Sequence, residues 1–157
     1  MAVPHDACSA EVLLGRALCD PRPTLVVEHR ALYPLGTWTR GPIRWGLKGE
    51  PRAATVVSCS AGVHEAILAG QRLWANHHVA VEVVPVCSLN PLLLAPVLRS
   101  LETTRRLVVL DPGWGTYGFS AEIMACAVES MPEYLDAAPI RIVPPPVPAP
   151  PSAPQES

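Results

Sequence analysis

One segment of the chain, residues 106–123, combines a short aliphatic run, a glycine-rich loop and the start of a helical pattern. The run Leu107–Leu110 is predicted to be a buried strand, since it is continuous, aliphatic and bounded by polar residues. Gly113, Gly115 and Gly118 follow it with the spacing G-x-G-x-x-G, which between a strand and a helix is typical of a dinucleotide-binding turn. A segment of this kind indicates an α/β unit.

Strands and helices are predicted to alternate over the central part of the chain. β-branched and aliphatic runs predict strands at 54–59, 79–86, 107–110 and 139–143, and apolar residues three and four apart predict the helices between them. Apolar residues make up 49% of the chain and aromatic residues 5%, as in domains whose strands are covered on both faces. The pattern predicts an α/β fold with a mainly parallel sheet, without fixing the strand order.

The N-terminal part of the chain lies outside this regular pattern. Apolar residues at helical spacing predict a helix over residues 10–18, capped by Asp6 or Ser9. The β-branched segment 24–28 predicts a short strand. Residues 31–52 show no periodicity and are rich in glycine and proline, so a connecting arm is predicted there.

These patterns divide the chain into four segments. Residues 1–33 are an N-terminal helix-and-strand unit, 34–52 the connecting arm, 53–143 the main α/β domain, and 144–157 a tail. Seven prolines fall within residues 144–154, so the tail is predicted to be extended or disordered rather than helical.

Charge and cysteine content bear on the class of protein. The net charge of −2 gives no reason to expect a nucleic acid or an anionic membrane as partner. No stretch reaches the ~20 apolar residues of a membrane span, and the N-terminus lacks the features of a signal peptide. The five cysteines are widely spaced, so they are predicted to be reduced, mostly buried residues. A soluble, cytoplasmic protein is expected.

The glycine spacing admits a first functional alternative, a small NAD(P)-binding oxidoreductase using residues 113–118. In such a unit the glycines allow the backbone to approach a pyrophosphate at the helix N-terminus, and an acidic residue after the next strand binds the ribose. Here the next strand, 140–143, runs into prolines with no carboxylate at its end. Trp114 and Tyr117 also crowd the loop.

A second interpretation comes from several segments taken together. They are residues 3–23, 24–33, 54–66, 113–123 and 134–143, with Asp-Pro-Arg-Pro at 20–23 and Ala-Glu-Ile at 121–123. In order and in register over residues 3–148, they resemble the beta subunit of the thiamine-diphosphate-dependent decarboxylase component of 2-oxo-acid dehydrogenases. That component is of the pyruvate dehydrogenase type and belongs to the transketolase superfamily.

The resemblance implies a fold for the main domain. It would be a three-layer α/β/α sandwich with a mixed, mainly parallel five-stranded sheet, like the transketolase C-terminal domain. Residues 1–33 would be the end of the family's pyrimidine-binding domain. In this fold the loop at Gly113–Ile123 only turns the chain into a helix and takes no part in chemistry.

The chain also departs from the family. The carboxylate that activates thiamine diphosphate and the active-site histidine belong to a part of the pyrimidine-binding domain that would precede Met1. The magnesium–diphosphate motif belongs to the alpha subunit, and no Gly-Asp-Gly occurs here. Val86–Leu89 replaces the family's Asp-Leu-Arg-Thr, and prolines replace its closing helix. No catalytic or cofactor-binding residue is therefore assigned to this chain, and thiamine diphosphate and Mg²⁺ are expected in partner subunits.

Two functional positions follow from the resemblance. Members of the family often bind a monovalent cation at the turn that matches residues 17–22. Asp20 would supply a side-chain oxygen there, and Ala17 and Arg22 would supply backbone carbonyls, which suit a hard cation. Asp136 matches an acidic position that helps some members to dock an acyltransferase.

The expected function is that of a subunit or fragment that acts in assembly or partner binding and is inactive alone. Its partners would be an alpha-type decarboxylase subunit, a chain with the pyrimidine-binding domain, and an acyltransferase. A homodimeric scaffold and the NAD(P)-binding oxidoreductase are the alternatives.

Overall fold

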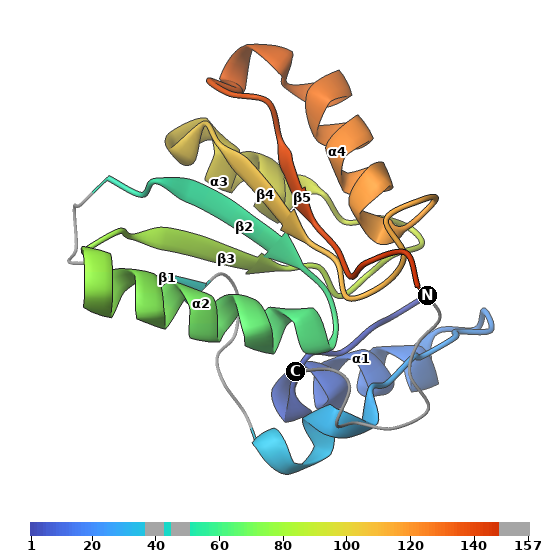
Figure 1. Cartoon of the computed structure of the whole chain (residues 1–157). Coiled ribbons are helices and arrows are strands. Elements are labelled where there is room, and N and C mark those ends of the chain that lie inside the picture. Colours follow the sequence, from blue (N-terminus) through green and yellow to red (C-terminus); the bar gives the residue numbers. More distant parts are fainter. Residues whose placement is uncertain (37–42, 45–50, 148–157) are drawn as a thin grey trace.

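A computed structural model of the chain describes residues 1–36, 43–44 and 51–147 (Figure 1). Its centre is a sheet with the strand order β1-β3-β2-β4-β5. The strands are β1 (Ile43–Arg44), β2 (Ala54–Ser58), β3 (Val81–Pro85), β4 (Leu107–Leu110) and β5 (Ile140–Ile142). The helices are α1 (Ala7–Cys19), α2 (Ala61–His77), α3 (Ala95–Thr104) and α4 (Phe119–Ser130), with short 3₁₀ helices at Arg30–Leu35 and Pro132–Tyr134.

The strands β2, β3, β4 and β5 run parallel to one another. Only the two-residue β1 is antiparallel, with Ile43 opposite Val83 of β3. The predicted α/β class and the mainly parallel sheet are thus confirmed. β1 lies inside the predicted connecting arm, most of which falls outside the described residues.

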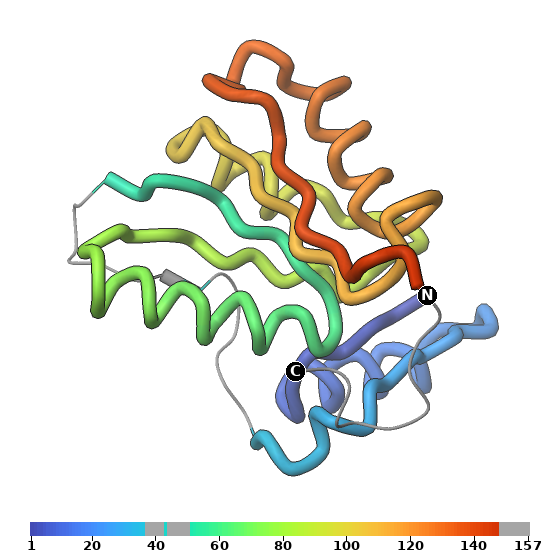
Figure 2. The backbone as a smooth tube through the Cα atoms, in the orientation of Figure 1, coloured from blue at the N-terminus to red at the C-terminus, as the bar shows by residue number. Residues whose placement is uncertain are grey.

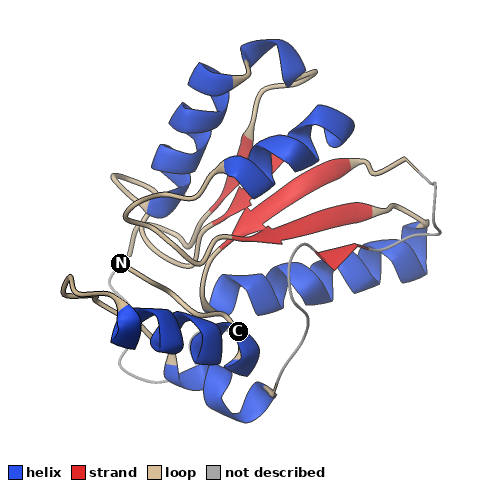
Figure 3. Ribbon diagram, turned by 180° about the vertical axis from the view of Figure 1, so that it is seen from behind, coloured by secondary structure: helices blue, strands red, loops and turns tan. Residues whose placement is uncertain are grey.

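Helices cover both faces of the sheet. On one face, Val83 of β3 packs against Val63 and Ile67 of α2. On the other face, the sheet packs against Leu101 of α3 and Ile123 of α4. Figure 3 shows α3 and α4 in front of the sheet and α2 behind it. The apolar residues at helical spacing supply these two cores, which is why the sequence pattern locates the helices well.

One buried contact between the sheet and α3 is polar. The Thr55 hydroxyl lies 2.7 Å from Ser100 Oγ and 2.6 Å from Thr104 Oγ1. Thr55 is fully buried, and both partners come from successive turns of α3. Because buried hydroxyls are costly unless hydrogen-bonded, this trio fixes α3 in one register against β2.

The N-terminal unit is attached at the carboxyl end of the sheet. Ala2 pairs with Val26 and with Ser88, which lies just beyond β3, and the Val3 N–H donates to the Cys87 carbonyl at 2.8 Å. Figure 2 traces this dark blue segment along that end of the sheet and into α1. The first residues therefore form a buried strap that holds α1 to the main domain.

The structure refines two N-terminal predictions. Asp6 caps α1, since its carboxylate accepts the Ser9 N–H at 2.7 Å and the Ser9 hydroxyl accepts the Asp6 N–H at 3.0 Å. The strand predicted at 24–28 is wrong, because the segment makes a single isolated bridge at Val26. Its β-branched residues have no neighbouring strand with which to form a ladder in the described part of the chain.

Within the described residues, β5 pairs with β4 and no strand pairs with its other edge. All three residues of β5 are exposed, and Ile140 and Ile142 retain 58% and 51% of their accessible surface. The predicted tail is described only as far as Val147, and residues 148–157 lie outside the described part. None of the described helices combines the length and the apolar character needed to cross a bilayer.

Candidate functional site

The glycine-rich loop ends a central strand and leads into α4, as predicted, but an acidic side chain occupies its inner edge. Asp111 directly follows β4 and is buried. Its Oδ1 accepts the Gly113 N–H at 2.9 Å, and its Oδ2 accepts the Ser120 N–H at 2.8 Å. Ser120 lies in the first turn of α4, where unpaired N–H groups attract anions. The Asp111 carboxylate therefore caps the N-terminus of α4, although Asp111 precedes Ser120 by nine residues in the sequence.

Packing requires glycine at position 118 and leaves little room for a side chain at position 115. A Cβ atom at Gly118 would collide with the Trp114 carbonyl oxygen and lie 2.9 Å from Asp111 Oδ2. A Cβ at Gly115 would lie 3.1 Å from a methyl group of Val143. The glycine spacing thus reflects a tight turn around a carboxylate and close contact with Val143, the residue that follows β5.

This geometry opposes the NAD(P)-binding alternative. A pyrophosphate would need the donors that Asp111 already uses, and it would meet a negative charge at the helix N-terminus. Trp114 is 60% exposed and Tyr117 fully exposed, so both aromatic side chains project away from the core. The loop behaves as a turn into a packing helix.

Beside this loop, the carboxyl end of the sheet holds a buried cluster of polar side chains that the sequence patterns did not reveal. His5 from the N-terminal strap is buried, and its Nδ1 lies 3.2 Å from Cys87 Sγ. The other ring nitrogen of His5 is 3.9 Å from Asp6 Oδ1 and has no hydrogen-bond partner. The order Cys–His–Asp is the arrangement found in nucleophilic thiol sites.

The electrostatics of this cluster do not activate the thiol. Burial, and secondarily the Asp6 charge, raise the pKa of Cys87 to about 11. Burial also lowers the pKa of His5, although the nearby Asp6 carboxylate opposes that shift. Neither His5 nor Cys87 lines either of the two surface cavities described below. A protonated thiol and a neutral imidazole pack here without reactive character.

The cysteine prediction holds in part. All five cysteines are free thiols, as expected. Cys59 is buried, and burial together with Asp111 and Cys87 raises its pKa to about 12. The expectation that most are buried is wrong, because Cys8, Cys87 and Cys126 are partly exposed and Cys19 is exposed at the last residue of α1.

The three residues of the predicted cation half-site line one cavity of about 420 Å³ between α1 and the loop after β3. Ala17, Asp20 and Arg22 face Ser88 and Asn90 across this space. Both carboxylate oxygens of Asp20 accept from the Arg22 guanidinium, at 3.0 and 2.9 Å. These hydrogen bonds lower the pKa of Asp20 to about 2. The oxygen predicted to bind a cation thus pairs with a cationic side chain.

Asp136, the predicted docking residue, lies in the loop between the 3₁₀ helix Pro132–Tyr134 and β5. Its Oδ1 accepts from Arg105 Nε at 2.7 Å, and its N–H donates to the Arg105 carbonyl at 2.9 Å. Arg105 also donates to the Glu133 carbonyl and lies 5.7 Å from the centre of the Tyr134 ring. Asp136 stays about half exposed and joins the end of α3 to the loop before β5. Its partner role remains a prediction.

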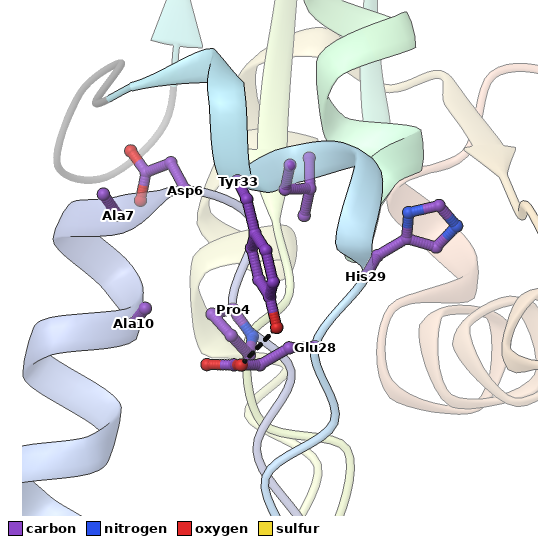
Figure 4. A pocket seen from close by; sticks show the side chains of 8 residues that line it. Pro4, Asp6, Ala7, Ala10, Glu28, His29 and Tyr33 are labelled. Carbon is purple, nitrogen blue, oxygen red and sulfur yellow. Dashed lines mark hydrogen bonds between the residues drawn. The ribbon is translucent and has the colours of Figure 1, made fainter.

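A second cavity, of about 330 Å³, lies between α1 and the 3₁₀ helix Arg30–Leu35. Figure 4 shows the Tyr33 ring reaching toward Pro4 and Glu28, with Ala7 and Ala10 of α1 across from it. The Tyr33 hydroxyl donates to Glu28 Oε2 at 3.0 Å, and this bond raises the pKa of Tyr33. The lining combines the apolar side chains of Pro4, Ala7, Ala10 and Leu32 with the polar side chains of Asp6, Glu28, His29 and Tyr33.

Metal chemistry has no preformed centre within the described ranges. No three His, Cys, Asp or Glu side chains of those residues are grouped so that they could hold a metal ion.

Comparison with known proteins gives one family match. The family described as "Transketolase, C-terminal domain" matches residues 45–157. This range starts within the predicted connecting arm, directly after β1, and includes the other four strands of the sheet.

Curated relatives match nearly the whole chain. The mitochondrial pyruvate dehydrogenase E1 component subunit beta of Chaetomium thermophilum is 30% identical, over 94% of this chain and 41% of its own length. The subunit beta-1 of Arabidopsis thaliana is 33% identical over 94% and 43%, respectively. The bacterial subunit beta of Rickettsia felis is 30% identical over 91% and 45%. The chain thus spans less than half the length of these relatives.

A solved structure supports the same fold. A chain described as "Split gene transketolase, inactive beta4 tetramer" superposes with a TM-score of 0.64 at 21% identity, over 94% of this chain and 48% of that one. At this level of identity the likeness concerns the fold alone.

Proposed function

Because this chain belongs to the transketolase C-terminal domain family, we propose that it is the C-terminal part of a decarboxylase beta-type subunit and acts by binding partner domains. It resembles pyruvate dehydrogenase E1 beta subunits over nearly its whole length. In this role it holds no catalytic residue and binds no thiamine diphosphate by itself. Partner domains bring the cofactor, Mg²⁺ and the reaction on a 2-oxo acid.

One observation carries the proposal. The match covers 94% of this chain but 41% of the Chaetomium thermophilum subunit, and it extends well in front of the family domain that starts at residue 45. Most of residues 1–36 therefore correspond to sequence of the relatives in front of the C-terminal domain. We assign them, as the end of a pyrimidine-binding domain, to the contact with that domain.

In this proposal the segments of the chain have different roles. The main domain, residues 53–143, supplies a stable α/β body, and residues 34–52 connect it to the N-terminal unit. An alpha-type subunit, and an acyltransferase that docks near Asp136, are the further partners. We expect the chain in the same compartment as its partner subunits, whether that is the cytoplasm or an organelle.

A calorimetric titration of the purified 157-residue chain with thiamine diphosphate and Mg²⁺ tests the first half of this function. The expected result is heat of dilution only, whereas the intact Rickettsia felis beta subunit together with its alpha subunit serves as the positive control. Saturable binding of the cofactor by this chain alone contradicts the assignment.

Reconstitution tests the second half. The chain is combined with that alpha subunit and with the part of the Rickettsia felis beta subunit that lies outside the match. We expect pyruvate-dependent reduction of an artificial electron acceptor in the full mixture and none when this chain is left out. If the mixture is equally active when the chain is left out, the chain has no role in the reaction.

A further inference from the structure

The helix α1 has an outer face without packing partners in the described part of the chain. None of its 13 residues is buried. Leu14 and Leu18, one helical turn apart and on the same side, keep 41% and 87% of their accessible surface. A helix of this length is marginal in water on its own and needs packing on an apolar face.

The inner side of α1 is already used. Ala7 and Ala10 line the cavity beneath Tyr33, and Leu13 and Ala17 line the cavity that faces the loop after β3. Leu14 and Leu18 line neither of these cavities. Both side chains are exposed, so the described part of the chain leaves much of their apolar surface uncovered.

The extended segment beside α1 has a similar open side. The Leu25 carbonyl accepts the Ala2 N–H at 2.8 Å, and the Val27 N–H donates to the Ala2 carbonyl at 2.9 Å. Val26 lies between them, with its N–H and carbonyl directed to the opposite edge, where no described backbone group pairs with them. The side chains of Leu25 and Val27 are 61% and 44% exposed.

The relatives indicate what covers these surfaces. Matches over 94% of the chain necessarily include most of residues 1–44, although the C-terminal domain family starts at residue 45. The relatives carry more than half of their length outside the match. The N-terminal unit is thus a small part of a larger body in these relatives, and its exposed apolar face is where that body continues.

We propose that the outer face of α1 (Leu14 and Leu18) and the open edge at Leu25–Val27 dock a protein domain equivalent to the unmatched part of the beta-subunit relatives. That domain presents an apolar surface to α1 and an unpaired strand edge to Val26. This inference rests on the proposed function, and it adds the surface through which the partner domain binds. A second copy of this chain is the competing occupant.

Co-expression tests the surface. The His-tagged 157-residue chain is produced together with the unmatched part of the Rickettsia felis beta subunit, and the complex is purified on the tag. We expect an equimolar complex with the unchanged chain. The double variant Leu14→Glu/Leu18→Glu should reduce the recovered partner by about tenfold or more, because two charges would be placed in an apolar contact.

A matched variant separates a local from a general effect. Val128 is 44% exposed on α4, so Val128→Glu places the same charge on another helix of the chain. Figure 1 shows α4 and α1 at opposite ends of the molecule. This variant should recover the partner as well as the unchanged chain does, and circular dichroism should show that both variants are folded.

The remaining outcomes decide against the proposal in different ways. Equal recovery by the double variant overturns the surface but leaves partner binding intact. No recovery by the unchanged chain overturns both the surface and the partner-binding function. If light scattering shows that the unchanged chain is a dimer and that the double variant is a monomer, a second copy of the chain occupies the face. In that case the choice of partner is overturned.

Discussion

The Nδ1 atom of His5 lies 3.2 Å from the Sγ atom of Cys87, which joins the N-terminal strap to the carboxyl end of β3. The backbone supports the same contact, because the Val3 N–H donates to the Cys87 carbonyl at 2.8 Å. The high pKa of the thiol keeps it protonated, so it can donate to the imidazole. This pair therefore makes the attachment of α1 depend on a neutral histidine.

The stability of the chain should fall between neutral and mildly acidic pH because of His5. Its folded-state pKa lies below the ordinary 6.5, so below pH 6.5 the unfolded chain takes up a proton that the folded chain does not. Stability is lost as pH falls from 6.5 to the folded pKa, by at most about 1.4 kcal/mol per pH unit. Urea unfolding at pH 5.0 to 7.5 on the unchanged chain and on His5→Asn measures this.

The variant provides the control for that slope. His5→Asn should be less stable at pH 7.5, but its stability should vary less between pH 7.5 and pH 5.0. Identical pH dependence in both proteins would show that His5 does not carry the effect.

The five thiols should differ widely in reactivity. Cys19 is exposed, whereas Cys59 is buried and has a pKa of about 12, so little of it is thiolate at neutral pH. With a disulfide reagent at pH 7.5, we expect one fast thiol, and Cys59 should react only after denaturation. Cys19→Ser should remove the fast phase. A fast phase that persists in this variant would place the reactive thiol elsewhere.

Removal of the carboxylate beneath the glycine-rich loop should destabilise the fold. Asp111→Ala leaves the Gly113 and Ser120 N–H groups without their acceptor, at a cost of about 1–3 kcal/mol. Urea unfolding measures the loss. The comparison is Asp136→Ala, whose half-exposed pair with Arg105 should contribute less than about 1 kcal/mol. Equal losses in the two variants would contradict the capping role.

The hydroxyl trio between β2 and α3 offers a further test. Thr55→Val keeps the shape of the side chain but removes the partner of Ser100 and Thr104, which should cost about 1–3 kcal/mol in unfolding free energy. Thr55→Ser keeps the hydroxyl and should lose less. If Thr55→Val leaves the free energy of unfolding unchanged, the hydroxyls of α3 bond to carbonyl groups of their own helix instead.

The sequence predicts the main domain well because periodicity and packing agree there. The predicted helix buries Val63 and Ile67, and the strand at Leu107–Leu110 buries Leu107 and Val109. The segment 24–28 has strand-like residues but no neighbour in the described part of the chain, and a strand needs one. Local pattern alone does not supply that information.

The site predictions show the same limit. The resemblance brings Ala17, Asp20 and Arg22 together in one cavity, yet periodicity cannot show that Arg22 pairs with Asp20. Likewise, His5 and Cys87 are 82 positions apart in the sequence, so no local spacing predicts their contact. Asp111 was visible in the sequence, two residues before Gly113, but its role depends on the turn geometry.

Asp111 has a consequence for interpreting glycine fingerprints in other sequences. A chain with an aspartate two residues before the first glycine carries its own anion to the end of the following helix. The pattern D-x-G-x-G-x-x-G thus predicts a closed turn, even where the glycine spacing alone suggests a phosphate site. In such chains, replacing the aspartate by a neutral residue is the natural first step for anyone who wishes to engineer anion binding into the loop.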